Sequence, residues 1–141
     1  MASFVKYQQF VEDLGDKVHD LIGTTDTLKV LLTNSAPNVA THVVRADTGE
    51  LTTGGGYTSG GEDTQNSGAE SGGTLTVTGV DVVFTAASGT IGPFRYVVLY
   101  IDTPSSPADP LIGYWDYTSA VTLQDGETFT VNFGASLFTV A

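Results

Sequence analysis

Two apolar runs in the second half of the sequence constrain the fold more than any other feature. The first extends from Pro93 to Ile101 and the second from Leu111 to Tyr117, with a loop rich in proline, serine and aspartate between them. Each run has the length and composition of a strand. Arg95 is the only charged residue in the first run, so we expect a central strand whose two faces are both covered. The core of a β-rich domain is therefore predicted here.

The charge of the chain limits its partners. Five Lys and Arg residues face 16 Asp and Glu residues, a formal net charge of -11 in 141 residues. Such a negative field repels phosphate backbones, so we expect no sequence-independent nucleic-acid binding. The first six residues do not resemble a secretion signal and no apolar run is long enough to span a bilayer, which predicts a soluble chain without a membrane partner. The chain contains no cysteine, so no disulfide framework and no thiol-based zinc site is expected.

Residues 3–22 have the periodicity of an amphipathic helix. Ser3 is a suitable N-cap and Gly23 a suitable terminator. Apolar residues recur at spacings of three and four on one face, namely Phe4, Tyr7, Val11, Leu14, Val18 and Leu21. The opposite, solvated face holds Glu12, Asp13, Asp16, Lys17 and Asp20. We expect this helix to cover the protein's own sheet, with docking on a partner as the alternative.

The rest of the chain, residues 28–141, reads as a single β domain. Strands are expected at 28–33, 74–78 and 80–86, and a brief strand or turn at 43–46. The Gly-rich region 52–73 lacks the lysine and the flanking elements of a phosphate-binding loop, so we interpret it as a flexible surface loop or an arm that a neighbouring subunit orders.

The C-terminal apolar residues predict a hairpin. Val121 and Leu123 share a buried face with Phe129, Val131 and Phe133 only if Val121 pairs with Phe129 across a three-residue loop. Such a loop needs a left-handed residue, which predicts a positive φ at Gly126. The fold class that follows is α+β, mainly β: an N-terminal helix followed by an antiparallel β-sandwich or a jelly-roll-like barrel, in one domain.

No group of residues forms a familiar catalytic or metal-binding motif. His19 and His42 have no nearby ligand partner at metal-binding spacing. Strand-end aspartates are interpreted as turn caps, with a glycosidase carboxylate pair as the alternative; they are Asp102, Asp109, Asp116 and Asp125. The segment 63–68 only faintly resembles a calcium loop. We expect no enzymatic activity, no cofactor and no metal.

Two kinds of residue are candidates for binding surfaces. Tyr114, Trp115 and Tyr117 could form an aromatic platform for sugars, although alternation places Tyr114 on the face opposite Trp115 and Tyr117, so part of the set must be core. Arg45 and Arg95 either balance neighbouring carboxylates or anchor a subunit interface.

Several runs together resemble small virion proteins of tailed bacteriophages that decorate or cement the outside of the head. The resemblance covers nearly the whole chain and carries no catalytic motif. The runs that carry it are Lys6–Leu14, Leu32–Pro37, Gly56–Gly61, Ile91–Tyr100, Asp109–Tyr117 and Leu123–Phe129.

The resemblance implies a protein of the outer capsid surface that binds the major capsid protein, commonly as a homotrimer. An acidic protein suits this position because packaged DNA repels it. The N-terminal segment and the Gly-rich region are the expected contacts, and the candidate interface residues are Phe4, Tyr7, Arg45, Tyr57 and Arg95. The alternatives are a tail or head-tail structural subunit and a receptor- or glycan-binding adhesin domain.

Overall fold

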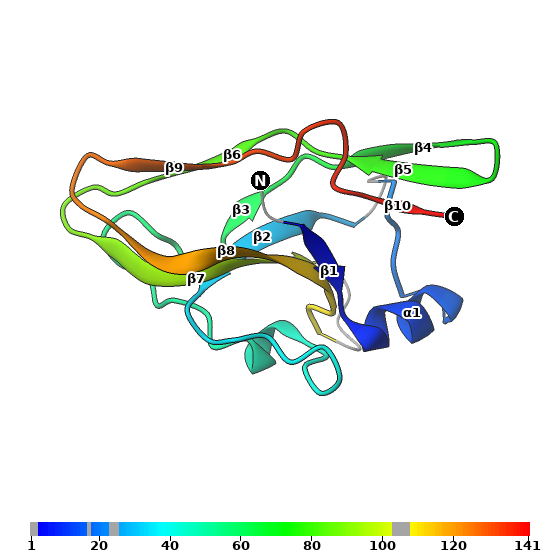
Figure 1. The fold of residues 1–141 in the computed structure, drawn as a ribbon, viewed down its shortest axis with the longest axis horizontal. Helices are drawn as coiled ribbons and strands as arrows, with labels where there is room; N and C mark the ends of the chain where they lie inside the picture. Colours follow the sequence, from blue (N-terminus) through cyan, green and yellow to red (C-terminus); the bar gives the residue numbers. More distant parts are fainter. Residues whose placement is uncertain (1–2, 17, 23–25, 103–107) are drawn as a thin grey trace.

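The chain folds into a mainly β structure with one short α-helix (Figure 1). A computed structural model describes residues 3–16, 18–22, 26–102 and 108–141. The strands are β1 (Phe4–Lys6), β2 (Leu28–Thr33), β3 (Glu62–Asp63), β4 (Ser67–Ser71), β5 (Thr74–Thr78), β6 (Val82–Thr85), β7 (Ile91–Ile101), β8 (Leu111–Leu123), β9 (Thr128–Val131) and β10 (Phe138–Val140). The helix is α1 (Gln8–Gly15), and a short 3₁₀ turn, η1, spans Arg45–Asp47.

The strands form two layers. One layer is an antiparallel five-stranded sheet with the order β1-β8-β7-β2-β3. The other, drawn above it in Figure 1, contains a three-stranded sheet, β10-β5-β4, and the pair β6-β9. This arrangement confirms the predicted antiparallel β-sandwich, in which β7 and β8 contain the two apolar runs of the sequence.

Strand β7 is covered on both faces, as its composition predicts. Val97 and Leu99 belong to the main core between the layers. Val98 and Tyr100 point the other way, into a smaller cluster that also contains Leu31. The loop after β2 contributes Val39 to the covering of this second cluster. The sheet therefore separates two apolar clusters.

Aromatic pairs join the two layers. The ring centroids of Phe94 and Phe129 lie 5.0 Å apart, and Trp115 lies 5.6 Å from Phe133. At the end of the sandwich, Phe4 of β1 stacks on Phe138 of β10 at 5.3 Å. These contacts bury large apolar areas from strands far apart in sequence, which is the main source of stability in a sandwich.

The predicted helix at 3–22 is wrong in its bounds. Residues Phe4–Lys6 pair with β8 instead, and α1 begins after Tyr7, whose side chain makes no capping hydrogen bond. The backbone hydrogen bonds available at the edge of β8 override the helical periodicity of the first residues. Asp13, expected on the solvated face, is buried, whereas Val11 on the predicted apolar face is 54% exposed. The predicted terminator Gly23 lies outside the described residues.

The predicted C-terminal hairpin is also wrong in its pairing. Phe129 pairs with Phe84 of β6, not with Val121, which pairs with Phe94 of β7. The chain leaves one layer at the end of β8 and joins the other. Gly126 has the predicted positive φ, +88°, because it lies in the turn in which Glu127 N–H donates to the Gln124 carbonyl.

Region 52–73 is not the plain loop that its composition suggests, since it contains β3 and β4. Tyr57 is buried in the main core. Gly61 has φ +72° and a Cβ there would collide with the Val30 carbonyl of β2, so the backbone packs directly on the sheet. The idea that a neighbouring subunit must order this region therefore loses its basis.

Candidate functional site

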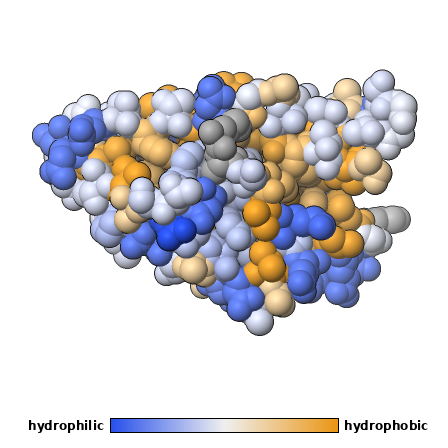
Figure 2. Space-filling model, in the orientation of Figure 1, coloured by the Kyte–Doolittle hydropathy of each residue, from blue (hydrophilic) through white to orange (hydrophobic). Residues whose placement is uncertain are grey.

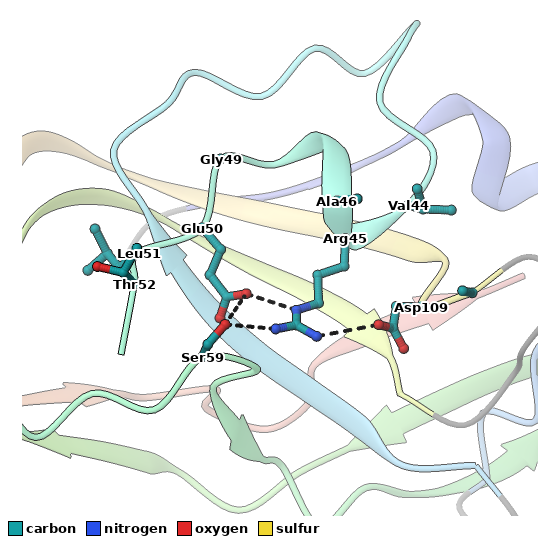
Figure 3. A pocket seen from close by; sticks show the side chains of 10 residues that line it. Val44, Arg45, Ala46, Gly49, Glu50, Leu51, Thr52, Ser59 and Asp109 are labelled. Atoms are coloured by element: carbon teal, nitrogen blue, oxygen red, sulfur yellow. Dashed lines mark hydrogen bonds and ion pairs between the residues drawn. The ribbon is translucent and has the colours of Figure 1, made fainter. Parts of the chain in front are cut away.

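A wide hollow among the described residues lies beside η1 (Figure 3). Its volume is about 760 Å³, and its walls come from the segment 44–52, from Ser59 and from Asp109 just before β8. Arg45 extends across it toward carboxylates on both sides, as the dashed lines in Figure 3 show. This Arg45 pocket is the first candidate for a functional site.

Local hydrogen bonds fold the segment that presents Arg45. Asp47 accepts hydrogen bonds from the N–H groups of Val43 and Val44, at 2.9 and 3.1 Å. These bonds hold the pKa of Asp47 below its usual value because they stabilise the carboxylate. Val44 also forms an isolated β-bridge with Pro110, which fixes the segment beside the start of β8.

Glu50 is the centre of the polar network in this pocket. Its Oε1 accepts from Arg45 Nε at 2.8 Å, and its Oε2 accepts from the Tyr57 hydroxyl at 2.6 Å and from Gly60 N–H at 2.5 Å. Ser59 Oγ–H adds a weaker bond to Oε1 at 3.3 Å. The Glu50 side chain is only 9% exposed, so these donors replace most of its hydration.

The same network provides hydrogen-bond partners for Tyr57 and Arg45. The Tyr57 hydroxyl accepts from Leu32 N–H of β2 at 3.2 Å while it donates to Glu50. Burial, together with Glu50, raises the pKa of Tyr57, so the hydroxyl remains a donor at all ordinary pH values. Arg45 also binds Asp109 at 3.5 Å and Ser59 at 2.9 Å. These bonds join the 50–60 loop to the sheet. The Glu50 carboxylate is already occupied by hydrogen bonds from the protein's own groups, so the network reads as structural.

The strand-end aspartates do not converge. Asp102 pairs with Lys29 at 3.2 Å, Asp109 with Arg45, and Asp116 with Arg95 at 2.8 Å. Asp125 accepts a hydrogen bond from Ser88 N–H at 3.0 Å. Each carboxylate therefore has its own local partner.

The residues at 114–117, considered as an aromatic platform only as an alternative to core packing, do not form an exposed surface. Trp115 is 3% exposed and packs against Phe4 and Phe133, which contradicts a sugar-binding role for its ring. Tyr117 is half-buried against Phe129, 5.1 Å away. Tyr114 lies on the opposite face, as alternation predicts, in contact with the rings of Tyr7 and Tyr96.

The five candidate interface residues are dispersed. Tyr7 and Tyr57 are buried in the protein's own core, so they cannot contact a neighbour as predicted. Phe4 is partly exposed at the edge of the sandwich, and Arg45 lies in the pocket. Arg95 binds both oxygens of Asp116, at 2.8 and 3.0 Å, and this contact lowers the pKa of Asp116. Both arginines thus balance carboxylates, the first of the two roles expected for them.

Sequence reasoning missed a buried pair beside α1. The His19 side chain is fully buried, with Nε2 3.7 Å from Asp13 Oδ2, and its ring packs edge-on against Phe10. Neither ring nitrogen has a hydrogen-bond partner among the described residues. Burial lowers the pKa of His19, and the charges of Asp13 and Asp26 oppose this only in part, which favours a neutral imidazole. Within residues 3–16, 18–22, 26–102 and 108–141, no group of three or more His, Asp or Glu side chains could hold a metal ion.

Glu50 was also missed. Its donors lie five to ten residues away in irregular segments, and no periodic pattern or motif connects them.

Comparison with family models, with curated proteins and with solved structures found no match for this chain. Among its described residues, none of the helical segments is both long and apolar enough to cross a membrane.

Proposed function

We propose that this chain is a virion structural protein that binds the outer surface of a tailed-phage head and cements neighbouring major capsid subunits. In this proposal the protein acts as a homotrimer and its partner is the major capsid protein. It works by binding and needs no cofactor.

The observation that carries the proposal is the uncompensated negative charge. Three of the five cations, Lys29, Arg45 and Arg95, are already ion-paired with carboxylates of the same chain. Only two cations remain to offset the carboxylates outside these pairs, so the surface of the protein is strongly negative. Such a surface is repelled by packaged DNA and favours the exterior of the head.

The internal organisation suits a cement. Glu50 holds the loop at 50–60 together, the Tyr57 hydroxyl joins this loop to Leu32 of β2, and aromatic pairs join the two layers. A protein that binds only the assembled shell stabilises that shell by mass action, and the stabilisation rises with the logarithm of its concentration relative to its dissociation constant. A folded, well-packed binding module loses little conformational entropy when it docks.

The test is co-sedimentation of the purified protein with heads of the encoding phage that lack it, followed by a heat challenge of the reloaded heads. The proposal predicts saturable binding at a fixed ratio to the major capsid protein and better survival of loaded heads. Heads that bind none of the protein would contradict it. Binding confined to tails or to the head-tail junction would assign the chain to a tail structural role instead.

A further inference from the structure

An apolar groove lies at one end of the sandwich, between α1, β1 and β10. One hollow of about 230 Å³ is lined almost wholly by apolar side chains, among them Phe4, Phe10, Val11 and Phe138. A second, more open hollow of about 590 Å³ adjoins it and shares Phe4, Lys6, Phe138 and Thr139. We call the two together the β1–β10 groove. Figure 2 shows hydrophobic residues gathered on this side of the molecule, where Figure 1 places β1, α1 and β10.

Strand β1 borders this groove with a free edge. It is the last strand of the five-stranded sheet, paired only with β8 among the described strands. Tyr7 N–H donates to the Ile112 carbonyl at 3.0 Å, so in an antiparallel ladder Val5 also turns its backbone groups toward β8. The N–H and C=O groups of Phe4 and Lys6 then point away from β8, along the groove.

Exposed apolar side chains flank the same edge. Val5 is 39% exposed and lines the larger hollow, and Val11 of α1 is 54% exposed and lines the smaller one. A free strand edge beside an apolar groove is a template for an added strand, whose backbone satisfies the edge while alternate side chains fill the groove. A docked helix would leave the outward N–H and C=O groups of β1 unpaired.

The negative charge of this protein indicates which kind of extended segment would bind at the edge of β1. A second copy of this chain would bring the same net charge of -11 to the contact. Glu12 is exposed on α1 beside Val11, and Asp16 is exposed just after the helix; together with the net charge of the chain they favour a segment with basic residues. The geometry and the charge point to the same occupant, an extended segment in which apolar and basic side chains alternate.

We infer that the β1–β10 groove binds such a segment of the protein that forms the head surface, which adds to β1 as a further strand. This inference rests on the proposed function, because it names the surface through which the chain would dock. Binding at this edge buries Val5 and Val11 and pairs the outward backbone groups of Phe4 and Lys6.

Two matched pairs of variants test the groove. Lys6→Pro removes the outward N–H but leaves the pairing with β8, whereas Lys6→Gln loses the same charge and keeps the N–H. Val11→Asp places a charge in the groove, and Val83→Asp places one on β6 at a residue of nearly the same exposure, 53%. All four changes are at surface or edge positions, and thermal unfolding of each variant verifies that it folds.

The measurement is the affinity of each variant for heads that lack the protein, at low and at high salt. Lys6→Pro should bind at least about tenfold more weakly than Lys6→Gln, which carries the same loss of charge, and Val11→Asp at least about tenfold more weakly than Val83→Asp, which should stay within about threefold of the wild type. Wild-type binding should weaken as salt rises, because basic groups of the partner are attracted to a chain with a net charge of -11. On binding, the amide protons of Phe4 and Lys6 should become protected from exchange.

Each other outcome overturns the inference in a distinct way. If the wild type binds and all four variants bind alike, the groove is not the docking surface, although the proposed function stands. If the wild type does not bind heads, the proposed function fails and the inference fails with it. If Lys6→Pro instead abolishes self-association of the isolated protein, the occupant is a second copy.

Discussion

Replacement of Glu50 should destabilise the protein far more than replacement of an exposed carboxylate. Glu50→Ala removes the acceptor of the Tyr57 hydroxyl and of Gly60 N–H, at 2.6 and 2.5 Å, in an environment where water replaces little of the loss. It also frees Arg45, whose side chain is 28% exposed and can be hydrated instead. Hydrogen bonds to a charged group contribute about 1.5–3 kcal/mol each. Two part-buried bonds therefore predict a loss of about 3 kcal/mol in the free energy of unfolding.

The assay is urea unfolding followed by fluorescence of Trp115, the single tryptophan, which is buried between the layers. Glu62→Ala is the matched control, because it removes the same charge from an exposed position of β3. It should change the unfolding free energy by less than about 0.5 kcal/mol.

A double-mutant cycle with Tyr57→Phe isolates the central bond. Glu50 and the Tyr57 hydroxyl should show a coupling of about 1.5–3 kcal/mol, since each variant leaves the other partner buried. Glu50→Ala within about 0.5 kcal/mol of the Glu62→Ala control would refute the reasoning, as would additive effects in the cycle.

Three further predictions concern backbone space and titration. Gly61→Ala should destabilise by more than about 3 kcal/mol, because its Cβ would meet the Val30 carbonyl, whereas Gly72→Ala, at a similar positive φ but in open space, should cost about 1 kcal/mol in the same urea assay. The pKa of His19 is lowered by burial, so wild-type stability should be full above pH 6.5 and decline as pH falls below 6.5, toward the folded-state pKa. His19→Gln should remove up to about 1.4 kcal/mol per pH unit of that slope, and an unchanged slope in urea titrations at pH 7.5 and 5.5 would contradict the assignment. Arg95→Ala should raise the pKa of Asp116 toward 3.8, which a carboxyl NMR titration measures; no change would show that the pair does not persist in solution.

Several strands could be predicted from the sequence because a buried strand is a contiguous run of apolar residues. An apolar run bounded by turn residues predicted β7, and its lack of a polar face correctly indicated cover on both sides. Strands β2 and β5 have the bounds that their composition predicted. In each case, the residues that define the element are contiguous in the chain.

The errors concern interactions between distant residues. The periodicity that predicted a helix through residues 3–22 contains no information about the free edge of β8, which takes Phe4–Lys6 as a strand. The faces of Val121 and Phe129 were assigned to one buried layer, and both do pack against the main core, but Phe129 reaches it from β9, in the other layer, paired with Phe84. Pattern alone does not distinguish a hairpin from a crossing between sheets.

The candidate site was less predictable still. Glu50 is one acidic residue among 16, and only the folded loop brings Arg45, Tyr57 and Gly60 to its two oxygens. Val11 was assigned to the apolar face of the predicted helix, and Val5 to neither face; the exposure of both beside a free strand edge emerges only when β1 separates from α1.

The central claim is that the protein occupies the outside of a phage head. The most direct measurement is an electron cryomicroscopy difference map between heads with and without the protein. We expect additional density on the outer surface, at sites between major capsid subunits, with the end of the sandwich that carries β1 and α1 directed toward the shell. Identical maps, or additional density only inside the shell or on the tail, would contradict it.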